Sequence, residues 1–170
     1  MASLFDMDIQ QLKGVGEKRA QLFHKLGVFS VGALLRFYPR AYEDWSHPYS
    51  IQEAPFDKPC CIRATVASRV TETRIRKGMT LYKFRVCDGL SVMNITLFNN
   101  RYAPDLLKEG KEFLFFGKVT GSFLHREMSG PLFESAGRGL RIRPIYSQTE
   151  GLSSRQIEQA MRQAFSLLPP

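Results

Sequence analysis

The sequence predicts a mainly β protein: a five-stranded OB-type Greek-key barrel with an N-terminal helical hairpin region and a C-terminal amphipathic helix. Apolar residues recur at helical spacing up to about residue 44, at strand spacing from about residue 58 to residue 146, and at helical spacing again from residue 153. A short helical segment falls between the third and fourth predicted strands, which is the order of an OB barrel. We therefore divide the chain into segments 1–57, 58–146 and 147–170.

The first segment contains two predicted helices. The first starts near Glu17 and stops at Gly27, because glycine readily takes the left-handed conformation that ends helices. Ser30 is the expected N-cap of the second helix, and Pro39 is expected to end it. The apolar faces of the two helices comprise Ala20, Phe23 and Leu26, and then Val31, Leu34, Leu35 and Tyr38.

The middle segment changes to the period of two that strands show. From Cys60 to Val66 every second residue is apolar, and the residues between them include Arg63. This alternation is typical of a half-buried strand. Asp88-Gly89 signals a hairpin turn between the second and third strands. The other predicted elements are strands at 82–87, 92–98, 111–119 and 140–145, a helical turn at 104–109, and a less regular return through residues 123–133.

The third segment predicts one amphipathic helix. Ser153 and Gln156 have the spacing of a capping box at its start. Its apolar stripe must pack on the barrel, on the N-terminal helices, or on a domain outside this chain. The stripe consists of Ile157, Ala160, Met161, Ala164, Phe165 and Leu168.

Composition points to a polyanionic partner. The formal net charge is +8 and the isoelectric point is about 9.6, which favours nucleic acid or an anionic membrane surface, with solubility alone as the alternative. No apolar run reaches the length of a membrane span, and the N-terminus lacks a secretory signal. Cys60, Cys61 and Cys87 lack metal-site spacing, so we expect reduced thiols in a cytosolic protein.

Catalytic motifs are absent from the sequence. A P-loop needs Gly-Lys followed by Ser or Thr, whereas Glu112 follows Gly110-Lys111 and Val119 follows Gly117-Lys118. His24, His47 and His125 are scattered, and the carboxylate pair Glu43-Asp44 is expected to be solvated. We expect no catalytic residue, no metal site and no cofactor in this chain.

A basic stretch predicts contacts with a nucleic-acid backbone. Between Arg63 and Arg85, basic residues are frequent and Glu72 is the single acid. The expected phosphate contacts are Arg74, Arg76 and Lys77, in the predicted loop between strands one and two. A solvated loop without a ligand is the alternative.

A glycine hairpin precedes the first helix and offers a second phosphate contact. Gly14 and Gly16 can aim free backbone N–H groups at a phosphate, with Lys13 and Lys18 adding charge. The alternative is a tight turn in which glycine serves packing alone.

The end of the third predicted strand carries candidate base-stacking residues. Met93, Ile95 and Leu97 share one parity, so if they face the core, Phe98 points outward. Phe98 and Tyr102, with Arg101 beside them, would form a platform for bases. Alternatively, these rings cover the end of the barrel.

These local patterns, in their order and spacing, resemble the N-terminal wedge region of the RecG family of ATP-dependent branched-DNA helicases. The matching segments are LKGVG at 12–16, LGV at 26–28, FYPRAYED at 37–44, FRVCDG at 84–89, LFN at 97–99 and PIYSQTEGL at 144–152. Two departures concern loops. Gly130-Pro131 stands where the family usually has His-Pro, and Leu90-Ser91 follows Asp88-Gly89 where the family usually has another glycine.

The resemblance implies a wedge that recognises branched DNA, such as forks and Holliday junctions, and splits strands during recombination and replication-fork repair. It places the family's stacking aromatics on Phe98 and Tyr102. It also implies that motor domains of the same parent chain, which use ATP and magnesium, follow Pro170, and that the protein is cytoplasmic, nucleoid-associated and bacterial in type. We expect a monomer. The remaining hypotheses are a generic single-stranded nucleic-acid-binding OB module, a motor-docking protein-interaction domain and a small enzyme.

Overall fold

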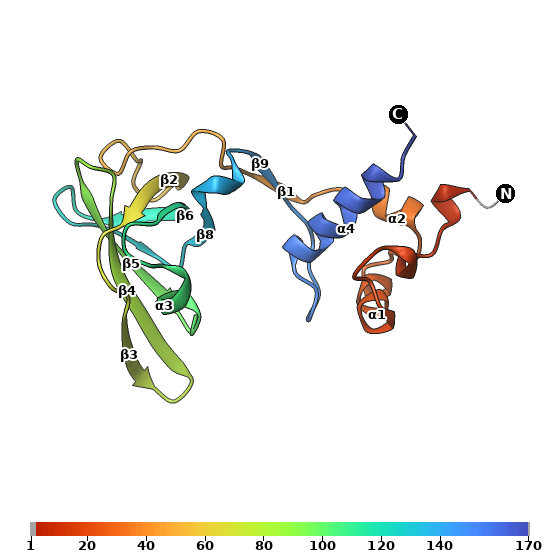
Figure 1. Cartoon of the computed structure of the whole chain (residues 1–170), viewed down its shortest axis with the longest axis horizontal. Coiled ribbons are helices and arrows are strands. Elements are labelled where there is room, and N and C mark those ends of the chain that lie inside the picture. The colour runs from red at the N-terminus through yellow and green to blue at the C-terminus, as the bar shows by residue number, and fades with distance from the viewer. Residues whose placement is uncertain (1–2, 170) are drawn as a thin grey trace. The chain divides into compact units, whose positions relative to one another are not determined.

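A computed structural model describes residues 3–169 (Figure 1). The chain folds into two compact units: residues 44–142 form one, and residues 1–43 together with 143–170 form the other. The first and third segments of the sequence therefore share a unit, which differs from the three-segment division, because residues far apart in the chain contribute to one core.

The unit of residues 44–142 is built on a closed five-stranded barrel. Its strands run in the order β2-β4-β5-β7-β6, and pairing of β2 with β6 closes the ring. β5 and β7 are parallel, whereas the other pairs are antiparallel. This is the predicted OB-type barrel, with bounds β2 (Pro59–Val66), β4 (Met79–Cys87), β5 (Val92–Phe98), β6 (Glu112–Gly121) and β7 (Arg126–Ser129).

Shorter elements complete this unit. The helix α3 (Ala103–Leu106) lies between β5 and β6, as predicted, and Ala103 is buried in the barrel core. The strand β8 (Leu132–Ser135) pairs with β6, and the turn η3 (Ala136–Arg138) follows it. Trp45 stacks on Phe116 at 5.5 Å and covers Cys61, which explains why β2 is buried on both faces at that point.

The fifth strand of the barrel is not the one that the sequence predicted. β9 (Ile142–Ile145) pairs with β1 (Ala41–Asp44) in a separate two-stranded sheet, and β7 takes the fifth place in the barrel. β7 was not predicted because one of its inward positions holds a charge. That residue, Arg126, is buried, donates from Nη1 to the Ala54 carbonyl oxygen at 2.9 Å, and lies over the Phe56 ring at 4.5 Å.

The loop predicted between the first two strands is instead a β-hairpin. β3 (Thr71–Arg76) pairs antiparallel with the first half of β4, and Lys77-Gly78 forms the turn. Every residue of β3 is exposed, so no apolar alternation marks it in the sequence. The hairpin projects from the barrel as a two-stranded ribbon (Figure 1). Of the three predicted phosphate contacts, Arg74 and Arg76 therefore lie on a strand and Lys77 lies in the turn.

The second unit is helical. Its elements are η1 (Leu4–Asp6), η2 (Ile9–Gln11), α1 (Glu17–Lys25), α2 (Val31–Leu35) and α4 (Ser154–Ser166). The predicted caps are present: the Ser30 hydroxyl accepts from the Ala33 N–H, and Ser153 with Gln156 forms the capping box. The stripe of α4 packs on the N-terminal helices, which settles the choice left open by the sequence.

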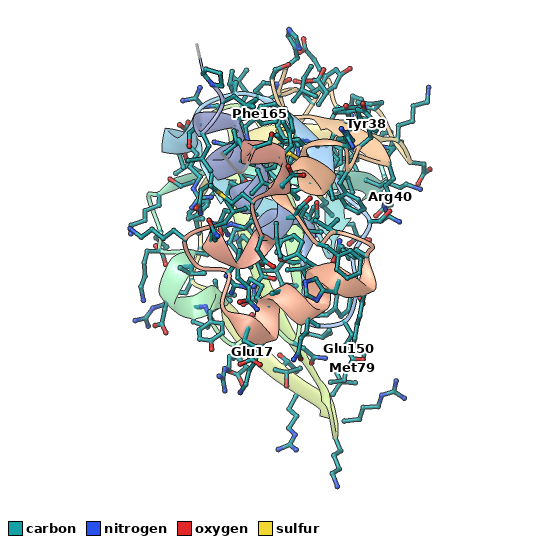
Figure 2. The ribbon with its side chains drawn as sticks, turned by 90° about the vertical axis from the view of Figure 1, so that its right-hand side faces the viewer. Glu17, Tyr38, Arg40, Met79, Glu150 and Phe165 are labelled. Carbon is teal, nitrogen blue, oxygen red and sulfur yellow. The ribbon has the colours of Figure 1, made fainter. Side chains whose placement is uncertain are left out.

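Two details of this unit differ from prediction. α2 ends at Leu35, before Pro39, because the N–H groups of Arg36 and Phe37 bond to carbonyls three residues back and tighten the last turn. Tyr38 is consequently exposed rather than part of a helical face. Phe165 also projects outward from α4 instead of joining the buried stripe (Figure 2). None of the described helices is long and apolar enough to cross a membrane.

Candidate nucleic-acid interface

Phe98 lies on the outward face of the barrel. Along β5, Met93, Ile95 and Leu97 are buried, whereas Phe98 keeps 46% of its surface exposed. The direction of this side chain, predicted from strand parity, is therefore confirmed. A Cβ added at Gly130 would lie 3.6 Å from the Phe98 ring, so the edge of the ring rests beside that turn.

Tyr102 is also exposed, and Arg101 accompanies it. Tyr102 occupies the N-cap of α3 and keeps 58% of its surface exposed. Nη2 of Arg101 donates to the Tyr102 hydroxyl at 2.8 Å, and the guanidinium lies 5.0 Å from the ring centroid. The pair thus presents an aromatic ring and a positive charge side by side, a combination that suits a base and its phosphate.

Asn99 ties this aromatic segment to the basic hairpin. Its backbone takes the left-handed conformation, with φ of 53°. Its side-chain Oδ1 accepts from the Thr80 N–H at 2.9 Å, and its Nδ2 donates to the Gly78 carbonyl oxygen at 3.1 Å. The hairpin turn and the start of the Phe98–Tyr102 segment are therefore neighbours. This link was not predicted, although the Asn99-Asn100 pair after a strand is a signal for a left-handed turn.

The predicted basic side chains belong to that hairpin. Arg74, Arg76 and Lys77 are all exposed, and Arg74 pairs with Thr80 across the ribbon. Met79, the first residue of β4, marks the end of the hairpin in Figure 2. Within the described residues, no carboxylate forms an ion pair with these basic residues. Their charge is therefore available to a polyanion.

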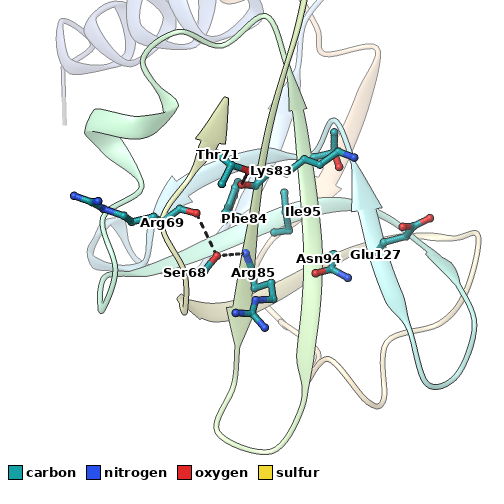
Figure 3. A pocket seen from close by; sticks show the side chains of 10 residues that line it. Ser68, Arg69, Thr71, Lys83, Phe84, Arg85, Asn94, Ile95 and Glu127 are labelled. Carbon is teal, nitrogen blue, oxygen red and sulfur yellow. Dashed lines mark hydrogen bonds between the residues drawn. The ribbon is translucent and has the colours of Figure 1, made fainter. Parts of the chain in front are cut away.

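A groove of about 560 Å³ lies on the outward face of β4 and β5 (Figure 3). Lys83, Arg85 and Glu127 line it, whereas the Phe84 and Ile95 side chains beneath are buried in the barrel core. The loop before β3 closes one side, held by the Ser68 hydroxyl, which accepts from the Arg85 N–H at 2.9 Å. Lys83 and Arg85 belong to the basic stretch of the sequence, but they were not predicted as site residues.

The glycine hairpin lies in the helical unit, where its carbonyl groups are occupied. Gly14 has φ of +83°, and its carbonyl oxygen accepts from Arg19 Nη1 at 2.6 Å. The Lys13 carbonyl oxygen accepts from Gln163 at 2.8 Å. Gly16 caps α1 without a side-chain hydrogen bond, and Lys13 and Lys18 are exposed. A Cβ added at Gly16 would meet no atom within 4 Å, so close packing does not require glycine there, and no side chain caps the N–H groups at the helix start.

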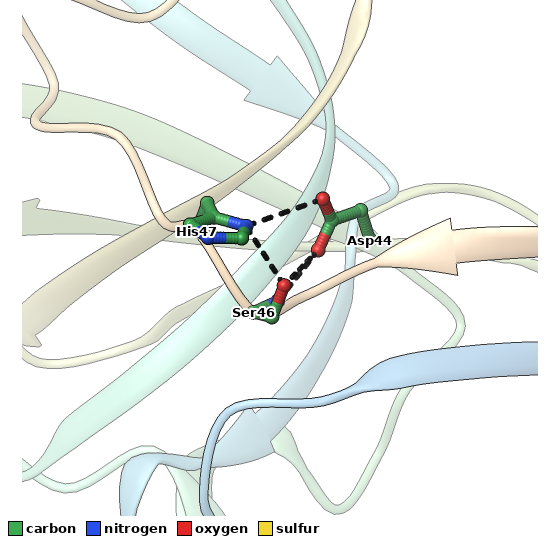
Figure 4. A network of polar contacts seen from close by, with 3 residues as sticks. All are labelled: Asp44, Ser46 and His47. Atoms are coloured by element: carbon green, nitrogen blue, oxygen red, sulfur yellow. Dashed lines mark hydrogen bonds and ion pairs between the residues drawn. The ribbon is translucent and has the colours of Figure 1, made fainter.

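Ser46, His47 and Asp44 form a Ser-His-Asp arrangement whose geometry is that of a turn rather than a catalytic triad (Figure 4). The Ser46 hydroxyl donates to Asp44 Oδ1, and a single ring nitrogen, His47 Nδ1, faces both the Ser46 hydroxyl at 2.8 Å and Asp44 Oδ2 at 3.4 Å. A triad instead needs histidine to bridge the two through its two different nitrogens. Hydrogen bonds from the Ser46 hydroxyl and N–H lower the pKa of Asp44, which is exposed at the end of β1.

Two of the three cysteines, Cys60 and Cys61, are buried. Burial raises the pKa of Cys61 to about 12 and also raises the pKa of Cys60, so both thiols stay protonated at neutral pH. No disulfide forms, and within residues 3–169 no cluster of His, Cys, Asp and Glu side chains has the arrangement of a metal site.

The fold and this surface define the class of protein: an OB-type barrel domain with neighbouring aromatic and basic side chains exposed to solvent. The family described as the RecG wedge domain matches residues 8–168. The chain belongs to the RecG wedge domain family.

Curated relatives and a solved structure agree with this assignment. The chain is 31% identical over 160 residues to the ATP-dependent DNA helicase RecG of Thermotoga maritima, covering 89% of this chain and 20% of that protein. It is 25% identical to RecG of Borreliella burgdorferi, covering 94% of this chain and 24% of that protein. A structure of RecG bound to a three-way DNA junction superposes with a TM-score of 0.79 at 27% identity, covering 92% of this chain and 22% of that one. The chain thus spans about a fifth of the length of these relatives.

Proposed function

We propose that this chain is the DNA-binding wedge domain of a RecG-type helicase, which recognises branched DNA and splits the strands at the branch point. The observation that carries the proposal is the pairing of two exposed aromatic rings, Phe98 and Tyr102, with a basic hairpin that Asn99 holds beside them. The relatives are named as ATP-dependent DNA helicases, and one is solved with a three-way junction.

The proposed mechanism divides the work between stacking and charge. Phe98 and Tyr102 cap the unpaired bases where two strands part, which offsets part of the unstacking cost of a few kcal/mol for each base step. Arg74, Arg76, Lys77 and Arg101 hold phosphates, which positions the DNA without reading its sequence. The shape of the branch, rather than its sequence, then selects the substrate.

The glycine hairpin is a further proposed phosphate contact. Gly14 and Gly16 leave backbone N–H groups open at the start of α1, and Lys13 and Lys18 supply positive charge nearby. This contact belongs to the helical unit, so variants at Lys13 and Lys18 test it independently of the barrel.

The whole protein is proposed to place this wedge in front of motor domains that use ATP and magnesium, in a cytoplasmic, nucleoid-associated monomer of bacterial type. In that arrangement the motor pulls the duplex arms and the wedge parts the strands. The chain itself supplies binding and strand separation, and the hydrolysis of ATP is proposed to occur elsewhere in the parent protein.

A gel-shift titration at matched salt tests the proposal with a fork, a four-way junction, a linear duplex and a single strand. We expect the fork and the four-way junction to bind more tightly than the duplex and the single strand. Tightest binding to the single strand would replace the wedge with a generic single-stranded nucleic-acid-binding OB module. Binding to none of the four would favour a motor-docking domain.

A further inference from the structure

Two turns at one end of the barrel carry apolar side chains at their tips. The turn between β6 and β7 is closed by backbone hydrogen bonds between Ser122 and His125, which leaves Phe123 and Leu124 as its central residues. The turn between β4 and β5 carries Leu90. Both turns lie at the end of the barrel away from the β3–β4 hairpin (Figure 1). Turns favour Gly, Pro, Asn, Asp and Ser, so the local fold does not require large apolar residues there.

These side chains, together with the first residue of β5, form an exposed apolar surface that we call the turn patch. Its members are Leu90, Val92, Phe123 and Leu124, with 90%, 55%, 67% and 84% of their surfaces exposed. A hollow of about 300 Å³ joins the two turns, and the residues that line it are Gln52, Ser91, Val92, Phe123, Leu124 and Arg126. An exposed apolar patch of this kind marks a surface that binds another molecule.

Arg126 holds the Phe123 ring in place. Arg126 is buried, and its Nη1 donates to the Ala54 carbonyl oxygen at 2.9 Å. Its guanidinium lies 4.5 Å from the centroid of the Phe56 ring and 5.5 Å from that of the Phe123 ring. The exposed Phe123 ring therefore rests on a fixed cation. A side chain that is held before binding loses less conformational entropy on binding, so the turn patch is preorganised.

The chemistry of the turn patch fits a protein surface rather than DNA. Its four members are apolar, and Arg126, the charged residue that lines the hollow, is buried and bonded to Ala54. DNA binding depends on phosphate contacts, which need accessible cations. Val92 and Phe98 also lie at opposite ends of β5, about 20 Å apart at a rise of about 3.4 Å per residue. The turn patch is therefore separate from the proposed stacking residues.

The size of the turn patch points to a partner in the same parent chain. A stable complex between two free proteins buries about 800 Å² on each side, and four side chains supply only part of that area. A tethered partner has an effective concentration in roughly the millimolar range, so a smaller surface is sufficient. This chain covers 20% of RecG of Thermotoga maritima and 24% of RecG of Borreliella burgdorferi, so most of a parent of that kind lies outside it.

We propose that the turn patch docks the motor part of the parent helicase, with Leu90 and Leu124 buried at the contact. The inference rests on the proposed wedge function and adds to it the surface through which the barrel is held. A docked barrel stays in place while the motor pulls the DNA arms against Phe98 and Tyr102. An undocked barrel would move with the DNA, and less of the motor's work would separate strands.

Hydrogen exchange without DNA tests the docking directly, by comparison of the parent helicase with the isolated chain. We expect the amides of residues 89–92 and 122–126 to exchange more slowly in the parent, because docking covers both turns. The amides of residues 77–79, in the turn of the β3–β4 hairpin, are the internal control. They should exchange at the same rate in both proteins.

The variant Leu90→Ser with Leu124→Ser removes the two most exposed apolar side chains of the patch. Leu140→Ser is the matched control, because Leu140 is an exposed leucine outside the patch. Burial of one leucine favours binding by about tenfold or more, so the double variant should weaken docking on the order of 100-fold. In the parent, it should restore fast exchange at both turns and slow the ATP-driven unwinding of a fork, whereas Leu140→Ser should do neither. In the isolated chain, fork affinity and melting temperature should stay the same for both variants.

Three outcomes overturn the inference. Equal exchange at both turns in the parent and in the isolated chain would leave the turn patch without a motor contact. Slower exchange in the isolated chain as its concentration rises would assign the patch to a second copy, and slower exchange on addition of a fork would assign it to DNA. A wild-type chain without fork preference would instead overturn the wedge function, and slow exchange in the parent would still support docking.

Discussion

The Asn99 side chain donates to the Gly78 carbonyl oxygen at 3.1 Å, which joins the end of β5 to the turn of the β3–β4 hairpin. The same side chain accepts from the Thr80 N–H, so one residue bonds both to the turn and to the start of β4. The stacking residue Phe98 immediately precedes Asn99 in the chain. The Asn99 side chain therefore adds to the β4–β5 backbone pairing that holds the basic and aromatic parts of the proposed interface side by side.

Replacing Asn99 should loosen this junction. Asn99→Ala removes both side-chain hydrogen bonds and places alanine in the left-handed region, so we expect a loss of about 2 kcal/mol in the free energy of unfolding. Asn99→Gly keeps the backbone conformation and should lose about 1 kcal/mol. Hydrogen exchange at the Thr80 amide should accelerate in both variants. Unchanged exchange at that amide would show that the side chain does not hold the turn.

Removing the exposed rings should affect DNA selection and leave the fold intact. Phe98→Ala and Tyr102→Ala should each reduce the preference for a fork over a duplex by about 1–3 kcal/mol, the scale of a lost base stack. Duplex affinity should persist because phosphates dominate it. Ile95→Ala is the contrasting control, since truncation of this buried residue should cost about 2–5 kcal/mol of stability. A large drop in melting temperature with unchanged fork preference would assign the rings to packing.

The basic hairpin should control the salt dependence of binding. Changing Arg74, Arg76 and Lys77 to alanine should weaken binding to all duplex-containing substrates. The slope of log K against log salt should flatten by about 2.7, because each duplex phosphate that a side chain neutralises contributes about 0.9. Titrations over a range of salt concentrations measure this slope. If it stays the same, the hairpin does not touch DNA.

Stability should fall at acidic pH through Asp88, which anchors the β4–β5 turn. Partial burial acts to raise the pKa of Asp88, but the N–H groups of Ser91, Ile51 and Leu90 outweigh it, and the pKa is lowered. A carboxyl with a lowered folded-state pKa stabilises the protein above its unfolded pKa and loses that contribution as pH falls below about 4. Asp88→Asn should be less stable at neutral pH and less sensitive to acid. Equal acid sensitivity in both proteins would assign the effect to other carboxylates.

The isolated chain should not hydrolyse ATP, because its sequence lacks a P-loop. A phosphate-release assay with and without forked DNA measures this. DNA-stimulated hydrolysis that disappears on mutation of a residue in this chain would contradict the expected division of labour with motor domains.

The features that could be predicted are those marked by residues a few positions apart in the sequence. The alternation in β5 indicated the outward direction of Phe98, and the Ser153–Gln156 spacing indicated the capping box of α4. Both depend on residues within a few positions of each other. Local patterns of this kind predict the direction of a side chain or the start of a helix without knowledge of the tertiary structure.

Features that depend on distant partners could not be predicted in this way. All residues of β3 are exposed, so the hairpin that carries Arg74 has no apolar period to detect. Arg126 can face inward in β7 because it donates to the Ala54 carbonyl oxygen and lies over the Phe56 ring. A charged residue at an inward position breaks the apolar alternation, so β7 was not predicted as a strand. The groove beside Lys83 depends on the register between β4 and β5, which cannot be read from the sequence.

A competition experiment decides whether the chain recognises the branch itself. The chain is bound to a labelled fork and challenged with an unlabelled fork or with an unlabelled linear duplex of the same phosphate number. Recognition of the branch predicts that the fork displaces the label at a lower concentration than the duplex, and that Phe98→Ala with Tyr102→Ala narrows this difference. Equal displacement by fork and duplex in the wild type would contradict branch recognition, because the chain would then bind charge alone.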